Sequence, residues 1–261
     1  VSVTPSTGAR HDGCALIAAD GIWSGLRAAH FDATLPHFEQ KSAARTLIPR
    51  ERAPAPLAAN ATFAWLSPGA HVVHYPVRGG REIAVVVVRS EMTASRDWNA
   101  DVASAWVEEA ARTFHASLRE LLAAGTGWRK WSLHSHPGVR RLATGAMALV
   151  GDAAHPVLPF PAQGGVMALE DPAPLAGDLR RTPDDTPAAL ARYAEARHAR
   201  VTRVAAASRR NGGIYHLDGL SAFARNAAIR ALGGRRIMEG YDWLYGWRAG
   251  SDDVRSARTR A

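Results

Sequence analysis

Two short clusters in the middle of the chain have the residue types and spacing needed to hold a large, partly anionic ligand. The first, Gly151–Pro156, places the acidic Asp152 directly after the apolar run 146–150. The second is Gly164-Gly165, at the start of a predicted helix. A carboxylate at a strand end can accept hydrogen bonds from sugar hydroxyls, and helix-start amides attract electron-rich atoms that glycine leaves uncovered. The plainer alternative is that Asp152 caps a turn and the glycines only permit a tight one.

A further acidic residue follows an apolar run near the beginning of the chain. Residues 14–19 predict a short strand buried on both faces, and Asp20 and Gly21 stand at its carboxyl end. Open α/β sheets bind ligands at this end of their strands. Ser24 could cap the next helical turn, and Arg27 could pair with Asp20 or approach a phosphate. A plain strand–turn–helix junction explains the same residues equally well.

His71 and Tyr75 are the other candidates for chemistry. They lie four residues apart in a predicted strand, so both should face one side and His74 the other. A histidine that is neutral near pH 7 can hydrogen-bond a ring hydroxyl and assist its deprotonation. The alternative is that the two side chains simply form one half-exposed face. A metal site built from these histidines, His134 and His136 is disfavoured, because no cysteine or acidic residue shares their spacing.

The elements that must position these groups change in type along the chain. Apolar patterns predict strands at 14–19, 46–49, 62–66, 71–76, 82–88, 129–134 and 146–150, and the alternating residues 1–7 predict a short edge strand that ends near Pro5. Helices are predicted at 101–124, capped by Asp101, after Gly164-Gly165, from Thr186 to Gly212-Gly213, and as short pieces within 214–240. Strands 71–76 and 82–88 form a predicted hairpin through Gly79-Gly80. The pattern indicates a mixed α/β fold with an inserted, mainly antiparallel sheet.

Two features near the C-terminal end carry their own predictions. Pro172 lies inside the helix expected after Gly165 and removes one main-chain bond, at about 3 kcal/mol, so the helix should kink or end there. The aromatic segment Tyr241–Trp247 should pack on the body of the protein. The arginine-rich tail after it should fray.

Composition limits the class of protein. The chain has 261 residues, 47% of them hydrophobic and 21% charged, which is typical of a globular protein. The net charge of +8 comes mostly from scattered arginines, without the basic stripe that nucleic-acid binding prefers. One cysteine, Cys14, allows no intrachain disulfide and favours a cytoplasmic location. No apolar run is long enough to span a bilayer, and the oligomeric state is left open.

Taken together, the two acidic segments resemble conserved motifs of the FAD-dependent aromatic hydroxylases, the single-component flavoprotein monooxygenases. Asp20-Gly21 with Ser24 and Arg27 resembles the family's "DG" motif, and Gly151–Pro156 followed by Gln163-Gly164 resembles its "GD" motif. The order of the motifs and the intervening antiparallel sheet also match. Three further stretches are most similar to the salicylate hydroxylase and 6-hydroxynicotinate monooxygenase branch: His71–Gly80, Ser208–Gly212 and Asp242–Gly246.

The resemblance implies FAD as cofactor, NADH or NADPH as reductant, and O2. The substrate would be a small hydroxy-aromatic carboxylate, such as salicylate, hydroxylated through a C4a-hydroperoxyflavin. Asp152 would bind the flavin ribityl chain, and Gly164 and Gly165 the pyrimidine edge. The implied cofactor-binding residues are Asp20, Gly21, Arg27, Asp152, Pro159, Gln163, Gly164, Gly165 and Val166. His71 and Tyr75 would be the catalytic candidates and, with Pro159, would line the substrate pocket, whereas His155 would be structural.

The sequence departs from the family at one point, because it contains no strand–GxGxxG–helix unit for the FAD pyrophosphate. We therefore expect the C-terminal part of a longer enzyme, with an incomplete Rossmann-like FAD-binding domain. The expected segments are 1–30 and 141–180 for FAD, 31–140 for the substrate-binding sheet and helix, and 181–261 for C-terminal helices. The alternative is a catalytically inactive remnant that folds, or binds a partner, without stable FAD.

Overall fold

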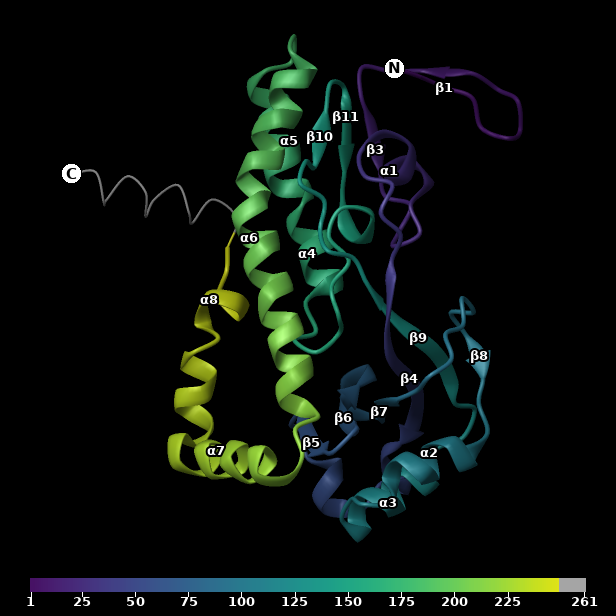
Figure 1. Cartoon of the computed structure of the whole chain (residues 1–261), viewed down its shortest axis with the longest axis vertical. Helices are drawn as coiled ribbons and strands as arrows, with labels where there is room; N and C mark the ends of the chain where they lie inside the picture. The colour runs from purple at the N-terminus through teal and green to yellow at the C-terminus, as the bar shows by residue number, and fades with distance from the viewer. Residues whose placement is uncertain (249–261) are drawn as a thin grey trace, which may run out of the picture. The chain divides into compact units, whose positions relative to one another are not determined.

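The computed structural model describes residues 1–248 (Figure 1). The arginine-rich tail, for which fraying is predicted, lies outside these residues from position 249 onward. The chain divides into two compact units. The first comprises 1–37, 135–211 and the segment from 232 onward, and the second comprises 38–134 and 212–231. Within the described range, no helix combines the length and the apolar character needed to cross a membrane.

A small sheet organises the first unit. Its strands are β10 (Ala143–Thr144), β11 (Met147–Leu149) and β3 (Leu16–Ala18), in that order, with β11 parallel to β3 (Figure 1). The two predicted apolar strands are therefore present, although shorter than expected. Because β3 and β11 run in parallel, their carboxyl ends lie at one edge of the sheet, which brings the segments after Ala18 and Leu149 together. A separate two-stranded ribbon pairs β1 (Ser2–Val3) with β2 (His11–Asp12).

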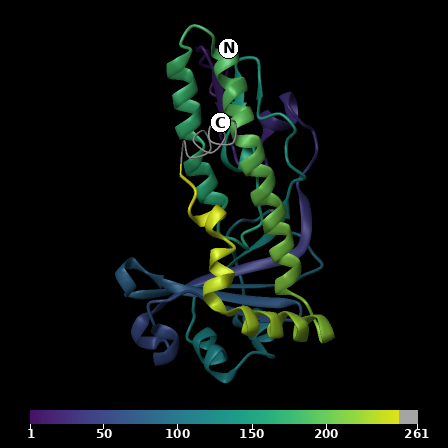
Figure 2. The same cartoon turned by 90° about the vertical axis from the view of Figure 1, so that its left-hand side faces the viewer.

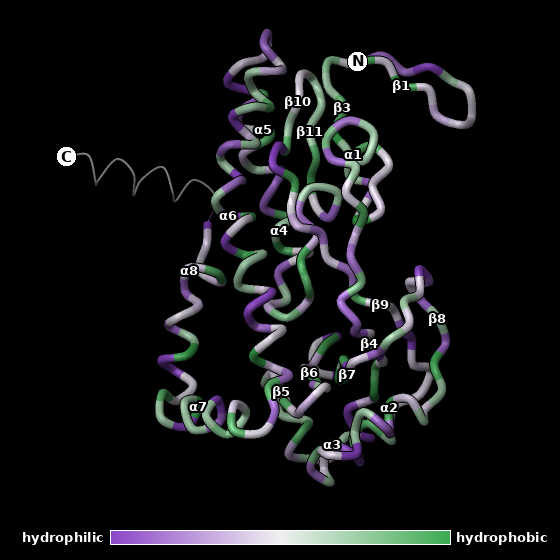
Figure 3. Tube along the Cα trace, viewed as in Figure 1, coloured by the Kyte–Doolittle hydropathy of each residue, from purple (hydrophilic) through white to green (hydrophobic). Residues whose placement is uncertain are grey.

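Helices pack beside this sheet. They are α1 (Gly25–His30), α4 (Gly164–Glu170), α5 (Pro172–Arg181), most of α6 (Thr186–Tyr215) and α8 (Asp242–Tyr245). α5 and α6 lie side by side in both views (Figures 1 and 2). Along α6, apolar and polar residues alternate in short bands (Figure 3). Its apolar side chains Leu190, Tyr193 and Val204 are fully buried against Leu149 and Met167 in one core cluster.

The second unit is built on a six-stranded sheet of order β5-β6-β7-β4-β9-β8. The strands are β4 (His37–Pro49), β5 (Phe63–Ser67), β6 (Ala70–Val77), β7 (Glu82–Ser90), β8 (Ala100–Asp101) and β9 (Arg129–Ser135). β6 and β7 form the predicted hairpin, joined through a short turn at Arg78–Gly80. β4 is much longer than the predicted 46–49, because it pairs with β7 from Lys41 to Pro49. The sequence did not indicate this length, because the first residues of β4 are polar.

One face of the sheet is covered by α2 (Ser104–Ala111) and α3 (Ala116–Ala123), as the turned view shows (Figure 2). The prediction of a single helix over 101–124 is wrong. α2 ends at Ala111, and His115 starts a new helix by accepting a hydrogen bond from the Ser117 amide at 3.3 Å. Asp101 is not a helix cap but the last residue of β8. In the sequence, the helical spacing of apolar residues continues across the break because Phe114, which lies between the two helices, packs in the same core as they do.

The C-terminal helices also differ in part from the prediction. α6 does not end at Gly212-Gly213 but continues to Tyr215, and neither glycine adopts a positive φ. Asn211, just before them, is buried and accepts a hydrogen bond from the Tyr241 hydroxyl at 2.9 Å, so tertiary contacts outweigh the low helix propensity of glycine. The short helices expected after residue 214 are present as the two parts of α7 (Gly219–Glu239), which meet at Gly233, where φ 71° and ψ 161° are not helical.

The predicted interruption at Pro172 is confirmed. α4 ends at Glu170 and α5 begins at Pro172. Asp171, between them, keeps helical dihedral angles of −56° and −43°, so the chain continues in the helical conformation while one main-chain bond is missing. Asp171, at this break, is fully buried, and its carboxylate accepts hydrogen bonds from other segments of the chain.

Candidate functional site

The loop after β11 is shaped by Gly151. This glycine has φ 57°, a conformation that L side chains avoid, and an added Cβ would lie 3.4 Å from Ala168 Cβ. The short turn Gly151–Ala153 follows and leaves the Asp152 side chain exposed. Burial of the surrounding loop raises the pKa of Asp152, and nearby His155 partly opposes this rise. Within residues 1–248 the Asp152 carboxylate makes no side-chain hydrogen bond.

The start of α4 presents uncovered main-chain amides. The first of its hydrogen bonds runs from the Met167 amide to Gln163 O at 2.9 Å, and no partner within the described chain takes the amides of Gly164, Gly165 or Val166. A Cβ on Gly165 would meet nothing within 4 Å. One on Gly164 would lie 4.0 Å from the Asp152 carboxylate, so the loop and the helix start are in contact.

Gln163, which precedes these amides, adds a buried acceptor. Its side chain is 3% exposed, and its Oε1 has no hydrogen-bond partner among the residues described. A buried polar atom is normally paired, so Gln163 Oε1 is a position where a donor from a ligand or a water would fit. Asp152, Gly165 and Val166 are exposed, so their acceptor and donor groups are accessible to a ligand. Pro159, predicted to lie on the substrate side of the flavin, is an exposed residue of the loop between these groups.

The segment after β3 is a compact, self-satisfied turn. Asp20 accepts hydrogen bonds from Ser24 Oγ at 2.5 Å and from the Leu26 amide at 3.2 Å. Burial raises the pKa of Asp20, but these bonds lower it more, so the net change is downward. Ser24 caps α1 by accepting from the Arg27 amide at 2.9 Å, as predicted. Gly21 has φ 79°, so the turn itself requires a glycine.

Arg27 joins the two acidic segments. It is 2% exposed, and its guanidinium donates to the carbonyl oxygens of Ile22 at 2.5 Å, Ala153 at 3.0 Å and Asp152 at 3.4 Å. The suggested ion pair with Asp20 is absent from the described structure, because the side chain is buried against main-chain acceptors instead. Burial lowers the pKa of Arg27. The sequence did not predict this role, because the acceptors are main-chain carbonyl oxygens, which every residue has whatever its type.

A buried ionic cluster holds the Gly151 loop from behind. Asp171 Oδ2 accepts from the Gly151 amide and from His155 Nε2, both at 2.8 Å, and Oδ1 accepts from Arg197 Nε at 2.8 Å. Burial raises the pKa of Asp171, but the hydrogen bond and charge of His155, the Gly151 amide and Arg197 together lower it. His155 therefore has the structural role expected of it.

The same cluster extends to the C-terminal segment. Arg197 Nη1 donates to Glu170 at 2.9 Å, and Arg200 donates to the same carboxylate at 2.7 Å and 3.2 Å. Arg200 also donates to the carbonyl oxygens of Trp243 at 2.9 Å and Leu244 at 3.0 Å. The predicted packing of the aromatic segment on the body is thus confirmed. Sequence patterns missed the cluster because its arginines lie 26 to 30 residues from the carboxylates that they bind.

In the second unit, strand register places His71 and Tyr75 on one face. His71 lies opposite Val88, and Tyr75 opposite Ala84. His74 faces the other way, as predicted, and it stacks on Phe63 with ring centroids 4.6 Å apart. Tyr75 is 37% exposed and borders a cavity of about 510 Å³, whereas His71 is 3% exposed. The shared face is therefore correct, but only Tyr75 borders that cavity.

His71 has a partner that the sequence did not reveal. Its Nδ1 lies 2.7 Å from Nε2 of His216, which follows α6, and the ring edge of Tyr215 packs against it at 5.2 Å. Burial lowers the pKa of His71 to about 3 and that of His216 to about 4. No spacing rule relates residues 145 positions apart. Across residues 1–248, no group of three or more potential metal ligands is present.

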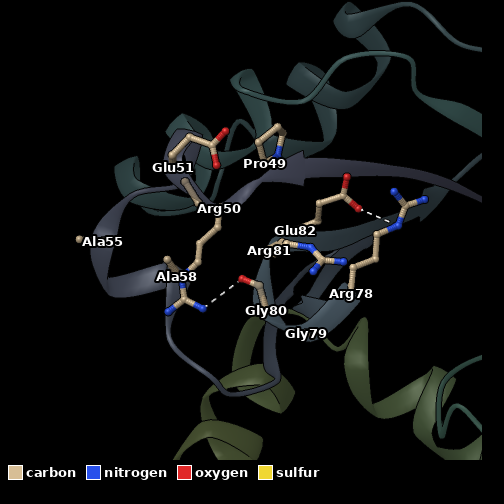
Figure 4. A pocket seen from close by; sticks show the side chains of 11 residues that line it. Pro49, Arg50, Glu51, Ala55, Ala58, Arg78, Gly79, Gly80, Arg81 and Glu82 are labelled. Carbon is tan, nitrogen blue, oxygen red and sulfur yellow. Dashed lines mark hydrogen bonds and ion pairs between the residues drawn. The ribbon is translucent and has the colours of Figure 1, made fainter.

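A larger cavity of about 1020 Å³ lies elsewhere in the second unit (Figure 4). It is bordered by three arginines, two of which are engaged: Arg78 pairs with Glu82 at 3.1 Å, and Arg50 donates to Gly80 O at 3.2 Å. The third is Arg81, which comes from the turn between β6 and β7. None of the predicted site residues borders this cavity.

Comparison with known proteins places this site in a family. The family model described as "FAD binding domain" matches residues 13–208. A 3-hydroxybenzoate 6-hydroxylase of Polaromonas naphthalenivorans is 33% identical over 254 residues, which cover 96% of this chain and 62% of that protein. The chain therefore belongs to the FAD-dependent aromatic hydroxylases, the flavoprotein monooxygenases that its two motifs resemble.

Solved structures agree on the fold. The structure "Salicylate hydroxylase substrate complex" has a TM-score of 0.80 at 26% identity, covering 96% of this chain and 66% of that one. HpxO of Klebsiella pneumoniae, complexed with FAD and uric acid, also has a TM-score of 0.80 at 26% identity, covering 92% and 61%. The chain spans about three fifths of the length of the curated relatives it matches first.

Proposed function

We propose that this chain carries the flavin-ring and ribityl part of the active site of an FAD-dependent aromatic monooxygenase. One observation supports this above all. The Asp152 carboxylate lies near a helix start, 4.0 Å from where a Cβ on Gly164 would stand, and the amides of Gly164, Gly165 and Val166 have no partner in the described chain. Donors and an acceptor at one place match a ligand that has both, as the pyrimidine edge and the ribityl hydroxyls of FAD do.

The residues present fit FAD in chemistry as well as in space. Gly165 leaves open space where a side chain would stand, and Gln163, two residues earlier, has a buried acceptor, Oε1, without a partner among the described residues. Asp152 would hold the ribityl chain, and the helix-start amides would favour negative charge on the pyrimidine edge. When bound, FAD supplies the redox chemistry, with NADH or NADPH as reductant and O2 as oxidant.

Other residues of the first unit position these contacts. Arg27 fixes the Asp20 turn to the Asp152 loop through carbonyl oxygens. Asp171 fixes the Gly151 amide and is itself held by Arg197. In this proposal Asp20 and Gly21 act mainly by shaping the turn that Arg27 anchors, and Pro159 restricts the loop that leads to the flavin ring. We assign 1–30 and 141–180 to FAD binding, and 181–248, the described part of the last segment, to the C-terminal helices.

The proposed substrate is a small hydroxy-aromatic carboxylate, and we assign its binding to residues 31–140. Relatives that act on 3-hydroxybenzoate support this class, as does the salicylate hydroxylase fold. His71 and Tyr75 on β6 would contact the ring, with His71 hydrogen-bonded to the ring oxygen and Tyr75 beside the cavity it borders. A single cysteine, Cys14, agrees with a cytoplasmic location.

Equilibrium titration of FAD against the purified chain, followed by flavin fluorescence, tests the proposal. Asp152→Ala removes a charged acceptor, so FAD affinity should fall about tenfold to a hundredfold while the melting temperature stays unchanged. Asp184→Ala is the matched control, because Asp184 is an exposed loop residue far along the chain. Equal affinities for the wild-type chain and Asp152→Ala would refute the assignment.

A further inference from the structure

The cavity of about 1020 Å³ in the second unit is formed by two segments that hydrogen bonds hold together. One is the end of β4 with the short turns after it, and the other is the turn between β6 and β7 (Figure 4). The Arg50 amide donates to Arg81 O at 3.0 Å, and the Arg50 side chain donates to Gly80 O at 3.2 Å. Pro49 lies opposite Glu82 in the sheet. The walls of the cavity are therefore held in place by the fold itself.

Positive charge in this cavity exceeds the negative charge that pairs with it. Of the three guanidiniums, only that of Arg78 has a carboxylate partner, Glu82 at 3.1 Å. Arg50 binds a carbonyl oxygen, which carries no net charge, and the Arg81 side chain has no hydrogen bond or ion pair within residues 1–248. The carboxylate of Glu51 also borders the cavity but lies apart from all three guanidiniums (Figure 4). Two guanidinium charges are therefore left without an ionic partner in the described chain.

The turn that carries two of these arginines has a strained main chain. Arg78 has φ 51°, and among the described residues only two others that are not glycine, Gln40 and Ala162, have a positive φ. Asparagine or glycine adopts this conformation more easily, and an exposed ion pair such as that of Arg78 with Glu82 stabilises a fold little. Strain of this kind is typical of segments that clamp a ligand. A ligand that binds the turn explains why an arginine stands at this position.

The charges and the walls define the class of ligand. Arginine binds phosphate and carboxylate oxygens through paired hydrogen bonds. Two guanidiniums without an ionic partner match the charge of nearly −2 that a phosphate monoester carries at neutral pH better than the single charge of a carboxylate. The segment at the end of β4 adds the apolar side chains of Pro49, Ala53 and Ala58. The ligand that fits has a doubly charged phosphate at one end and an apolar body at the other.

We propose that this cavity binds a phosphate monoester whose phosphate contacts Arg50 and Arg81 and whose apolar body lies against the segment at the end of β4. The site is distinct from the flavin and substrate sites proposed above, because none of the residues named for them borders this cavity. The inference therefore does not depend on the proposed function. A ligand bound here joins the end of β4 to the turn between β6 and β7.

Titration of phenyl phosphate into the nitrogen-15-labelled chain tests the site, because amide resonances report where a ligand binds. The amides of Gly79, Gly80 and Arg81 should shift to saturation. Inorganic phosphate has no apolar body and benzoate has one charge, so each should bind at least about fivefold more weakly. Absence of a saturable shift at these amides would overturn the proposal. Benzoate that binds as tightly would overturn the phosphate, and inorganic phosphate that binds as tightly would overturn the apolar contact.

Substitutions separate a built site from diffuse surface charge. Arg50→Gln and Arg81→Gln should each weaken phenyl phosphate binding at least about tenfold, because each removes a charge-assisted hydrogen bond. Arg52→Gln is the matched control, since Arg52 is exposed in the same short helix as Arg50 but does not border the cavity. It should change the affinity by less than about twofold. The exposed Arg81 side chain has no polar partner within residues 1–248, so Arg81→Gln should keep the melting temperature. An equal loss of affinity in Arg52→Gln and Arg81→Gln would overturn the proposal.

Discussion

The two units bury polar side chains in opposite ways. In the first unit, Asp171, Glu170, Arg197 and Arg200 are charged groups that pair with one another and with main-chain atoms. In the second, His71 and His216 form a pair that burial and positive neighbours keep neutral. The ionic cluster holds the Gly151 loop in place through the hydrogen bond from the Gly151 amide to Asp171. The histidine pair is joined by a contact between its ring nitrogens, and its rings become charged only when the pH falls well below neutral.

The largest expected effect comes from a substitution that breaks the ionic cluster. Arg197→Met removes a guanidinium that is 1% exposed and leaves Asp171 and Glu170 short of a partner. Unfolding free energy should fall by about 3–5 kcal/mol, as measured by urea denaturation. Arg235→Met removes a partner of Glu239 at 3.6 Å on the surface and should change it by less than about 1 kcal/mol. A loss below about 1 kcal/mol for Arg197→Met would remove the contrast between the units.

The second-largest expected effect is a difference between the two units in how their stability depends on pH. The pKa of His71 is lower in the fold than in the unfolded chain, so its contribution is complete above about pH 6.5 and is lost as pH falls toward 3. Asp171 also has a lowered pKa, so its contribution is lost only below about pH 4. Between pH 6.5 and 4.5 the wild-type chain should lose about 2–3 kcal/mol through His71.

Urea denaturation at a series of pH values measures this window. The double variant His71→Phe/His216→Phe should show a much flatter profile between pH 6.5 and 4.5, while its loss below pH 4 remains. An equally steep profile in the double variant would show that the histidine pair is not the source.

A smaller effect separates stability from ligand binding in the first unit. Gly165 lies in the first turn of α4, and a Cβ there meets nothing within 4 Å. Gly165→Ala should therefore raise unfolding free energy by about 0.5–1 kcal/mol, since alanine is the better helix former. The same methyl group would occupy the space assigned to flavin, so FAD affinity should fall. Unchanged affinity would place the flavin elsewhere.

The smallest effect concerns the other buried histidine. His74 is fully buried on β6, and neither of its ring nitrogens has a hydrogen-bond partner within the described chain. His74→Phe keeps the stacking on Phe63 and removes two unsatisfied polar atoms, so stability should rise by up to about 1 kcal/mol. Thermal denaturation measures this change. A clear loss of stability would mean that the imidazole of His74 makes a stabilising polar interaction, as that of His71 does.

Local rules were enough for much of the fold. Apolar runs located β3 and β11, the glycines located the start of α4, and Pro172 located the end of that helix. Each of these depends on neighbours in sequence. The rules failed where tertiary contacts outweigh propensity: α6 passes through Gly212-Gly213, and polar residues of β4 form strand because β7 pairs with them.

The candidate site shows the same limit. Motif resemblance named Asp152, Gly164 and Gly165, whose groups remain unpaired within residues 1–248. It did not reveal that Arg27 binds carbonyl oxygens or that His216 contacts His71. Both contacts join segments more than a hundred residues apart, and neither follows from a spacing along one element.

One measurement tests the central claim most directly. Riboflavin contains the isoalloxazine ring and the ribityl chain without phosphates, so it should occupy the part of the site assigned to residues 151–166. Titration of riboflavin into the nitrogen-15-labelled chain should shift the amide resonances of Gly164, Gly165 and Val166 to saturation, and Asp152→Ala should weaken this response. Amides at the start of α4 that stay unmoved while other resonances shift would contradict the account.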